Sequence, residues 1–220
     1  MSKEKDKVIL SYGDSLIRES DLKLLDGPLW LNDRLITFYF EYLYEQEYQC
    51  SSKLAFISPE VSQFVKMAAK NEIEIFLEPL NLPEKELIVM AVNNSNDPDR
   101  PGGSHWSLLM YSSQARKFLH FDSSGGMNSD AARQLALMVF GYLSSSLNQQ
   151  RHDFIIEEVP VLQQQNGYDC GIHLICNADH ATRHIFINGH YDTLDKLSDS
   201  IVKQKRSELK KLILDLGSRN

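Results

Sequence analysis

Short apolar runs in the middle of the chain are separated by polar turns, and these runs predict β-strands. Residues 87–92 are continuously apolar, and residues 106–111 and 117–121 are two further runs rich in aromatic and aliphatic side chains. Residues 112–116 have the length of a hairpin connection, so the last two runs are predicted to pair as antiparallel neighbours in the centre of a sheet. Two shorter runs predict further strands, at residues 8–12 and 154–159.

Capping residues and apolar spacing predict helices around these strands. Aromatic and aliphatic side chains crowd nearly every face of the segment after residues 29–33, which predicts a buried helix with Asn32 or Asp33 as N-cap. Ser58 followed by Pro59 predicts a second helix that extends to about residue 70. Three later helices are predicted, over residues 129–147, 170–187 and much of 196–220, and Asn128 or Ser129 is the expected cap of the first.

Runs of strands beside runs of helices, without regular βαβ alternation, are typical of an α+β fold. We expect helices packed on a central mixed, largely antiparallel sheet. The 220 residues are 42% hydrophobic and contain no linker-like segment, which predicts one domain over residues 1–220. Residues 1–7 are charged almost throughout and are expected to form a flexible N-terminal tail.

Charge and cysteine content restrict the function classes. The chain has 23 basic and 30 acidic residues without a basic block, so we expect no nucleic-acid partner. No run approaches the roughly 18 apolar residues of a membrane span, so no membrane insertion is expected. The three cysteines are scattered and odd in number, which argues against a disulfide framework and for a reducing, intracellular compartment.

Three polar residues lie at the ends of predicted elements, in a pattern that suits nucleophilic catalysis by a thiol. His105 precedes one strand of the predicted hairpin, and Asp122 follows the other. Antiparallel pairing places both residues at the same rim of the sheet. A thiol protease needs a thiolate, an imidazole that takes up its proton and a group that orients the imidazole. Cys170 would supply the thiol.

Cys170 is predicted to begin a helix, where free backbone N–H groups favour an anion. Gln164, in the glutamine-rich loop before it, is placed to form an oxyanion hole together with the Cys170 N–H group. The acidic neighbour Asp169 works against a thiolate and has no explanation beyond capping. Cys50 and Cys176 are expected to be structural. A buried, inert Cys170 remains the alternative from these residues alone.

A metal site is a second alternative. His173, Cys176, His180 and His184 share one stripe of the predicted helix, at spacings of three, four and four residues. Eleven helical residues rise about 16 Å, and one ion cannot bridge that length. We therefore expect a partly buried polar stripe here, and no metal or cofactor.

The motifs around these residues resemble those of a known family. The segments G-S-H-W-S-L-L at 103–109, F-D-S at 121–123 and Q-x-N-x-x-D-C-G at 164–171 are similar to the sentrin-specific and adenovirus-type (Ulp-like) cysteine proteases. The block W-L-N-D at 30–33 matches the same family's early signature. Further blocks at 55–61 and 76–80 resemble the deneddylase branch, which acts on the neddylation modifier.

The resemblance implies a papain-like architecture and assigns roles to the candidate residues. His105 would be the general base, Asp122 its orienting group and Cys170 the nucleophile. The family spacing, six residues before the cysteine, selects Gln164 over Gln163 and Gln165 as the oxyanion donor. The residues expected to bind substrate are Trp30, Asp33, Gly103 and Trp106, with the two tryptophans clamping a diglycine tail and Asp33 facing a basic residue of that tail.

The resemblance also implies the substrate and the setting of the protein. Proteases of this family cut after the Gly-Gly tail of a ubiquitin-like modifier, here the neddylation modifier, during precursor processing and removal from lysines of conjugates such as cullins. We expect a monomer in the cytoplasm, the nucleus or both. A sumo-specific protease, an acyltransferase of the same clan and a non-enzymatic ubiquitin-like-binding module are the alternatives. Residues 93–104 are hypothesised to form a mobile lid.

Overall fold

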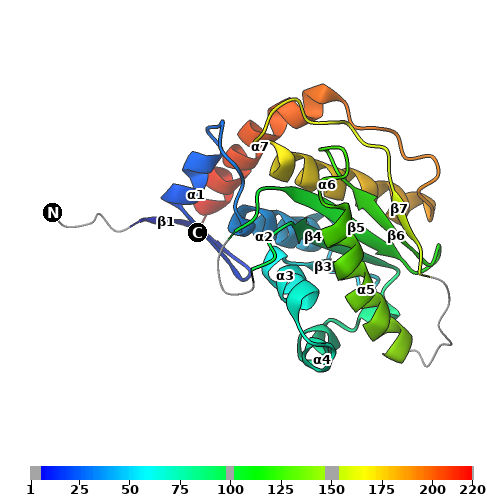
Figure 1. The fold of residues 1–220 in the computed structure, drawn as a ribbon. Coiled ribbons are helices and arrows are strands. Elements are labelled where there is room, and N and C mark those ends of the chain that lie inside the picture. Colours follow the sequence, from blue (N-terminus) through cyan, green and yellow to red (C-terminus); the bar gives the residue numbers. More distant parts are fainter. Residues whose placement is uncertain (1–5, 98–101, 147–153, 220) are drawn as a thin grey trace.

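A five-stranded sheet forms the centre of the molecule, in the computed structural model of residues 6–97, 102–146 and 154–219 (Figure 1). Its strands follow the order β3-β4-β5-β6-β7, and a two-stranded hairpin, β1 and β2, stands beside it. The strands are β1 (Val8–Tyr12), β2 (Ser15–Arg18), β3 (Leu54–Ile57), β4 (Leu87–Asn93), β5 (Trp106–Ser112), β6 (Lys117–Phe121) and β7 (Ile156–Glu158).

The sheet is mixed, as expected, but its outer strands pair differently from its centre. Strand β5 is antiparallel to both β4 and β6, whereas β3 pairs parallel with β4 and β7 pairs parallel with β6. The expectation of a largely antiparallel sheet therefore holds for the three central strands alone. The outer strands are parallel because helices lie between them and their partners in the sequence, and parallel strands need such crossover connections.

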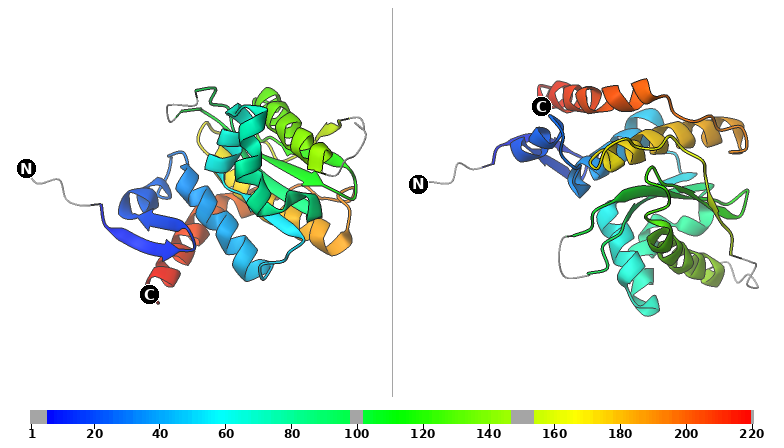
Figure 2. Two further views of the ribbon diagram at one scale, coloured as in Figure 1. Left: turned by 90° about the horizontal axis from the view of Figure 1, so that it is seen from below. Right: turned by 45° about the horizontal axis from the view of Figure 1, so that its top comes forward.

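Both faces of the sheet are covered by helices (Figure 1, Figure 2). Strand β4 is buried on both sides: Leu87, Val89 and Ala91 belong to one hydrophobic core, and the alternate residues between them belong to the other. The helices on the first side are α2 (Asp33–Tyr42), α6 (Cys170–Asn188) and α7 (Asp199–Gly217), and those on the second side are α3 (Pro59–Met67), α4 (Lys70–Leu77) and α5 (Ser129–Ser146). These two cores fix the sheet rim on which the candidate residues lie.

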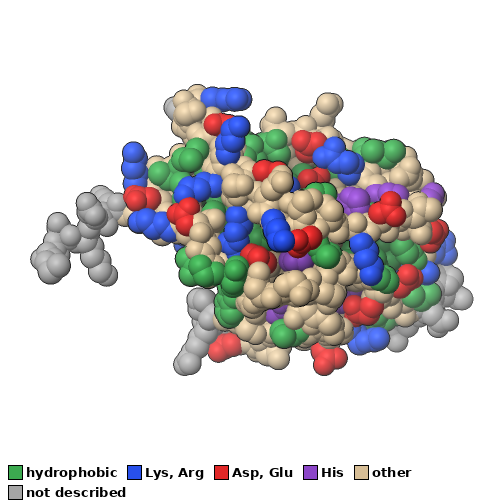
Figure 3. Space-filling view, turned by 90° about the horizontal axis from the view of Figure 1, so that it is seen from above, with side chains coloured by type: hydrophobic (Ala, Val, Ile, Leu, Met, Phe, Trp, Pro, Cys, Tyr) green, Lys and Arg blue, Asp and Glu red, His purple; other side chains and the backbone are tan. Residues whose placement is uncertain are grey.

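Helix α7 forms an outer layer over α6 and ends beside strand β1 (Figure 2). A Cβ atom added at Gly217 would lie 2.5 Å from the carbonyl oxygen of Ile9, so the close approach requires glycine there. Acidic and basic side chains are interspersed on the face that α7 presents, as Figure 3 shows. No helix in the described residues has the length and apolar character needed to cross a bilayer.

Most predicted elements are present, with bounds that differ by a few residues. Asn32 caps α2 through a bond from the Leu35 N–H group, and Ser58 caps α3 with Pro59 at its first position. The second predicted helix ends earlier than expected, at Met67, and a separate helix follows it. The elements that the sequence pattern missed are short: β2, β3, α4 and the six-residue helix α1 (Glu19–Leu24).

Two residues of the expected flexible N-terminal tail, Asp6 and Lys7, lie within the described part of the chain. Residues 1–5 lie outside the described residues. The Asp6 carboxylate accepts hydrogen bonds from the N–H and hydroxyl groups of Ser20, and the Lys7 carbonyl accepts one from the Glu19 N–H group. Asp6 and Lys7 are therefore hydrogen-bonded to the start of α1, and the expectation of flexibility stays a prediction for residues 1–5.

Candidate active site

His105 and Asp122 meet at one rim of the central sheet, as the predicted hairpin requires. The register pairs Leu108 with Phe121, so the start of β5 lies beside the end of β6. The His105 Nε2 atom lies 2.6 Å from Asp122 Oδ1, and both side chains are buried. The separation of 17 residues in the sequence is thus compatible with direct contact because the strands turn back on each other.

Asp122 is held ionised by its surroundings. Its Oδ1 atom also accepts a bond of 2.8 Å from the Ser124 N–H group, and Oδ2 accepts one of 2.8 Å from the Asn128 N–H group. Burial alone would raise the pKa of Asp122, but the hydrogen bonds from His105 and these two backbone groups hold the pKa below its ordinary value of 3.8. A fixed anion therefore faces the imidazole.

His105 lies between this carboxylate and the Cys170 thiol. Burial by itself lowers the pKa of an imidazole, but hydrogen bonds to Asp122 and Cys170 outweigh it and raise the pKa of His105 to about 9. Because Nε2 is bonded to Asp122, Nδ1 is the nitrogen left to face the thiol. The arrangement favours a protonated imidazole next to the sulfur, which is the charge state that stabilises a thiolate.

Cys170 is buried at the first position of α6. Asp169 occupies the N-cap position, but its side chain makes no capping bond and instead pairs with Arg206 of α7. Gly171 packs against the loop before α2, and a Cβ atom at this position would lie 2.8 Å from the Leu31 Cβ atom. This contact brings the nucleophile's helix against the segment that carries Trp30.

His105 and Cys170 line a groove of about 500 Å³. All four predicted substrate-binding residues line it: Trp30, Asp33, Gly103 and Trp106. The tryptophans are fixed by their indole N–H groups, which donate to the Gly167 carbonyl from Trp30 (2.6 Å) and to the Leu31 carbonyl from Trp106 (3.0 Å). Trp30 is 48% exposed, which is unusual for so large an apolar residue and leaves its face available to a ligand.

Gln164 lies beside the same rim, although it is not among the residues that line the groove. Its Oε1 atom accepts from the Ser123 hydroxyl, and Nε2 donates one hydrogen to the Asn166 carbonyl, which leaves the second hydrogen for another acceptor. Gln163 differs, because its Nε2 donates to the carbonyls of both Asp122 and Val161. Gln164 is therefore better suited than Gln163 to an oxyanion.

The described ends of the loop between β4 and β5 are pinned by residues that the sequence pattern did not single out. The Asn94 side chain accepts from the N–H groups of Ser104 and His105. The buried Lys66 ammonium donates to the carbonyls of Asn93 and Ser95, and burial lowers the pKa of Lys66 to about 8. Residues 98–101 of the hypothesised lid lie outside the described residues, so its movement stays a prediction.

Asn128 connects the rim to a buried polar network. Its Nδ2 atom donates to the carbonyls of Val92 and His105 and to the Ser107 hydroxyl, which in turn contacts the buried His120. The sequence suggested Asn128 merely as a helix cap. Its spacing of six residues from Asp122 gave no signal of this role, since the network forms across three strands.

We expect Asn128→Ala to destabilise the fold by about 2–3 kcal/mol, because three buried acceptors lose their donor and a small cavity forms. Urea denaturation followed by circular dichroism measures this change. Asn188→Ala, at an exposed position of α6, provides the matched control and should change the free energy of unfolding by less than about 0.5 kcal/mol. Equal stabilities of the two variants would contradict the prediction.

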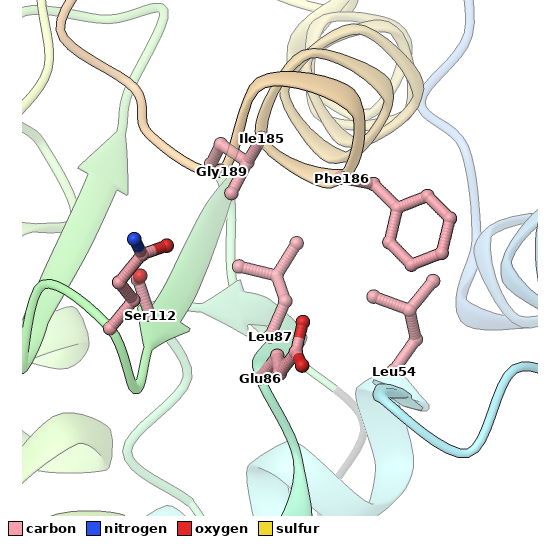
Figure 4. A pocket seen from close by; sticks show the side chains of 8 residues that line it. Leu54, Glu86, Leu87, Ser112, Ile185, Phe186 and Gly189 are labelled. Carbon is pink, nitrogen blue, oxygen red and sulfur yellow. The ribbon is translucent and has the colours of Figure 1, made fainter.

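A second pocket, of about 360 Å³, lies at the opposite end of the sheet (Figure 4). Leu54, Leu87, Ile185 and Phe186 supply its apolar lining, and Ser112 is the last residue of β5, the strand that follows His105. Seven strand residues span about 23 Å, so this pocket is remote from Cys170. It contains neither a thiol nor an imidazole and is not part of the candidate site.

The histidine stripe of α6 has side chains that are either hydrogen-bonded to other parts of the protein or buried. His180 donates to the Asp195 carbonyl, and His184 contacts the Thr193 hydroxyl. His173 and Cys176 are buried. Across residues 6–97, 102–146 and 154–219, no group of three or more potential ligands is placed to hold a metal ion.

Comparison with known proteins shows similarity to cysteine proteases over most of the chain. Residues 29–218 match the model of the Ulp1 protease family, C-terminal catalytic domain. The chain is 42% identical to sentrin-specific protease 8 of Rattus norvegicus over 98% of each sequence. It is 39% identical to NEDD8-specific protease 1 of Arabidopsis thaliana over 79% of this chain and 74% of that protein.

The fold is also found in a solved structure. The C-terminal Ulp1 protease domain, determined in complex with the yeast ortholog of SUMO, superposes with a TM-score of 0.78. The superposition covers 98% of this chain and 90% of that one, at 18% sequence identity. At this identity the likeness concerns the fold alone, and it confirms the predicted α+β architecture.

Proposed function

The chain belongs to the Ulp1 protease family and is a cysteine protease, and we propose that it cuts after the C-terminal diglycine of NEDD8, the neddylation modifier. The contact of His105 with both Asp122 and Cys170 at the end of a groove carries the proposal. The identity to two proteases named for NEDD8 or for sentrin, over most of the chain, supports the choice of modifier.

In the proposed reaction, His105 takes the proton of Cys170, and the thiolate attacks the carbonyl carbon of the last glycine. The oxyanion that forms accepts hydrogen bonds from the Cys170 N–H group and the free Nε2 hydrogen of Gln164. The imidazolium then returns its proton to the leaving amine, and a thioester remains. Water hydrolyses the thioester with His105 as base, so the thiol is regenerated.

The groove suits a narrow, basic tail. Trp30 and Trp106 both line the groove, and we propose that glycine residues of the tail, which have no side chains, pass between them. Three carboxylates line the groove, from Asp33, Glu60 and Asp97, and its described lining contains neither lysine nor arginine. We propose that Asp33 receives a basic side chain of the tail, since Asn32 and not Asp33 caps α2.

The conjugates, the oligomeric state and the cellular location are proposals as well. Processing of a precursor and release from lysine isopeptides use the same thioester chemistry, so conjugates such as cullins fit the proposed function. We propose a monomer with one domain, since the thiol, imidazole, carboxylate and groove of the proposed site are complete without a second subunit. Three free thiols are compatible with the reducing cytoplasm or nucleus.

A panel of C-terminal fluorophore conjugates of NEDD8, SUMO and ubiquitin tests the proposal. We expect the NEDD8 conjugate to be hydrolysed with a kcat/KM at least about tenfold above the other two, because groove contacts discriminate in the transition state. Cys170→Ala serves as the blank for contaminating proteases. Faster cleavage of the SUMO conjugate would show that the family assignment holds but the modifier is wrong.

The same panel distinguishes a protease from an acyltransferase and from a binding module. An acyltransferase would transfer the modifier to an added amine in preference to water, which intact-mass spectrometry detects. A binding module would retain the conjugate without releasing the fluorophore. The His105 imidazole contacts both the Cys170 thiol and the Asp122 carboxylate, and this complete set favours the protease over the binding module.

A further inference from the structure

Asp169 places an anion directly before the proposed nucleophile, where it works against a thiolate. Its carboxylate is nonetheless partnered. Oδ1 accepts from Arg206 Nε at 2.9 Å and Arg206 Nη2 at 2.7 Å, and Oδ2 accepts from Asn166 Nδ2 at 2.7 Å. Both charged side chains are mostly buried, with exposures of 15% for Arg206 and 21% for Asp169. The pair is therefore shielded from solvent and worth more than a surface ion pair.

Arg206 reaches this position from the middle of α7 and uses all three guanidinium nitrogens. Besides the carboxylate, it donates to the carbonyls of Leu24, Leu29 and Tyr168. The guanidinium also lies 5.7 Å from the centre of the Tyr168 ring. These contacts fix the planar group in one orientation, a geometry that lysine does not reproduce.

The contacts join two segments that border the groove. Leu29 immediately precedes Trp30, and Tyr168 and Asp169 immediately precede Cys170. The two segments also meet directly through the bond from the Trp30 indole to the Gly167 carbonyl. Arg206 thus lies behind the junction between one groove wall and the nucleophile's helix.

We propose that Arg206 is a positioning residue that neutralises Asp169 beside the nucleophile and clamps the Trp30 segment against the start of α6. The inference rests on the proposed function, in which Cys170 is the nucleophile. Arg206 does not touch the reacting atoms. It acts through Asp169 on the charge next to the thiol and through Leu29 on the shape of the groove.

Other charged groups surround the start of α6 and contribute to the field there. His105 and Asp122 face it from the sheet rim, and His173 lies one turn further along the helix. Burial lowers the pKa of His173, while Asp169 and Asp199 act in the opposite direction. Arg206 is the cation in contact with Asp169 among these groups, so its removal leaves that carboxylate uncompensated.

The rate of Cys170 alkylation by iodoacetamide, measured against pH, tests the electrostatic part without any substrate. A Cys50→Ser background removes the exposed thiol, and Cys176 stays protonated because burial raises its pKa to about 12. We expect Arg206→Met to move the midpoint of the alkylation profile to higher pH by about one unit and to lower kcat/KM at pH 7 about tenfold. Arg206→Met/Asp169→Asn should restore the midpoint, since the uncompensated anion is gone.

Two further variants separate charge from folding. Arg183→Met removes an arginine of α6 that also pairs with carboxylates, but 13 residues or about 20 Å along the helix, and should leave the profile unchanged. Arg206→Lys keeps the charge but loses the planar guanidinium that makes several hydrogen bonds at once. It should therefore retain the midpoint of the alkylation profile and raise KM several-fold. Arg206→Lys can also be measured if Arg206→Met does not fold.

An unchanged midpoint in folded Arg206→Met, or one that stays shifted in the double variant, would overturn the inference. So would an Arg206→Lys profile displaced as far as that of Arg206→Met. If Cys170 of the parent protein were not alkylated preferentially, the proposed function and this inference would both be wrong. If the alkylation results were as expected but the NEDD8 conjugate were not the preferred substrate, the choice of modifier alone would be wrong.

Discussion

Asp122→Asn should lower kcat/KM by about 10²- to 10⁴-fold, because the imidazole loses the anion that orients it and stabilises its protonated form. The pH profile should change as well. The basic limb for the parent protein is expected near the His105 pKa of about 9, where the imidazolium loses its proton. In the variant this limb should move toward the ordinary imidazole value of 6.5. Measurement of kcat/KM between pH 5 and 10 gives both results.

The matched control is Asp130→Asn, which removes an exposed carboxylate from the first turn of α5. It should leave kcat/KM and its pH profile within about twofold of the parent, since the charge of an exposed carboxylate is screened by water and salt. If the basic limb of Asp122→Asn stayed where it is in the parent, His105 would not owe its raised pKa to Asp122. The assignment of Asp122 as orienting group would then be wrong.

The pair of His105 and Asp122 makes the free energy of unfolding depend on pH, and the two residues act in opposite directions as the pH rises. The raised pKa of His105 contributes stability that is present below about 6.5 and is lost as the pH rises through about 9. The lowered pKa of Asp122 contributes stability that is present above 3.8 and is lost as the pH falls through its folded value. The pair therefore stabilises the fold most between about pH 3.8 and 6.5. Asp122→Asn should make the free energy of unfolding depend less on pH.

The rim that holds His105 and Asp122 was predictable because a hairpin is a local structure. Two adjacent apolar runs and a short connection specify antiparallel pairing, and pairing fixes which strand ends meet. The N-caps Asn32 and Ser58 were predictable for the same reason, since capping involves residues three positions apart. Local patterns thus located the elements that carry the base and its partner.

Contacts between segments distant in the sequence were not predictable in this way. Arg206 lies 37 residues from Asp169 and 177 from Leu29, and its helix shows an ordinary charged, amphipathic pattern. The Asn128 amide joins strands β4 and β5, and Lys66 reaches a loop from a neighbouring helix. Strand β3 was missed because its four residues pair in parallel with β4 through a crossover, which leaves no hairpin signal.

Gly103→Ala should lower kcat/KM for the NEDD8 conjugate about 100-fold, mainly by raising KM, since a wall of the groove must shift. A Cβ atom at this position would lie 1.9 Å from Asn93 Oδ1. Asn93 cannot easily retreat, because its Oδ1 atom accepts from the Ser95 N–H group and its carbonyl is held by Lys66. Gly103 also has φ +89°, a conformation that alanine rarely adopts.

Gly125→Ala separates the clash from the backbone strain. Gly125 also has a positive φ, of +62°, but nothing lies within 4 Å of an added Cβ atom, so this variant carries the strain without the collision. Both variants should lose about 1 kcal/mol of stability through strain, and Gly103→Ala alone should lose substrate affinity. Asn93→Ala combined with Gly103→Ala should recover part of the loss, because the colliding amide is gone. Equal KM values for the two glycine variants would mean that the groove wall tolerates the displacement and that Gly103 does not contact the tail.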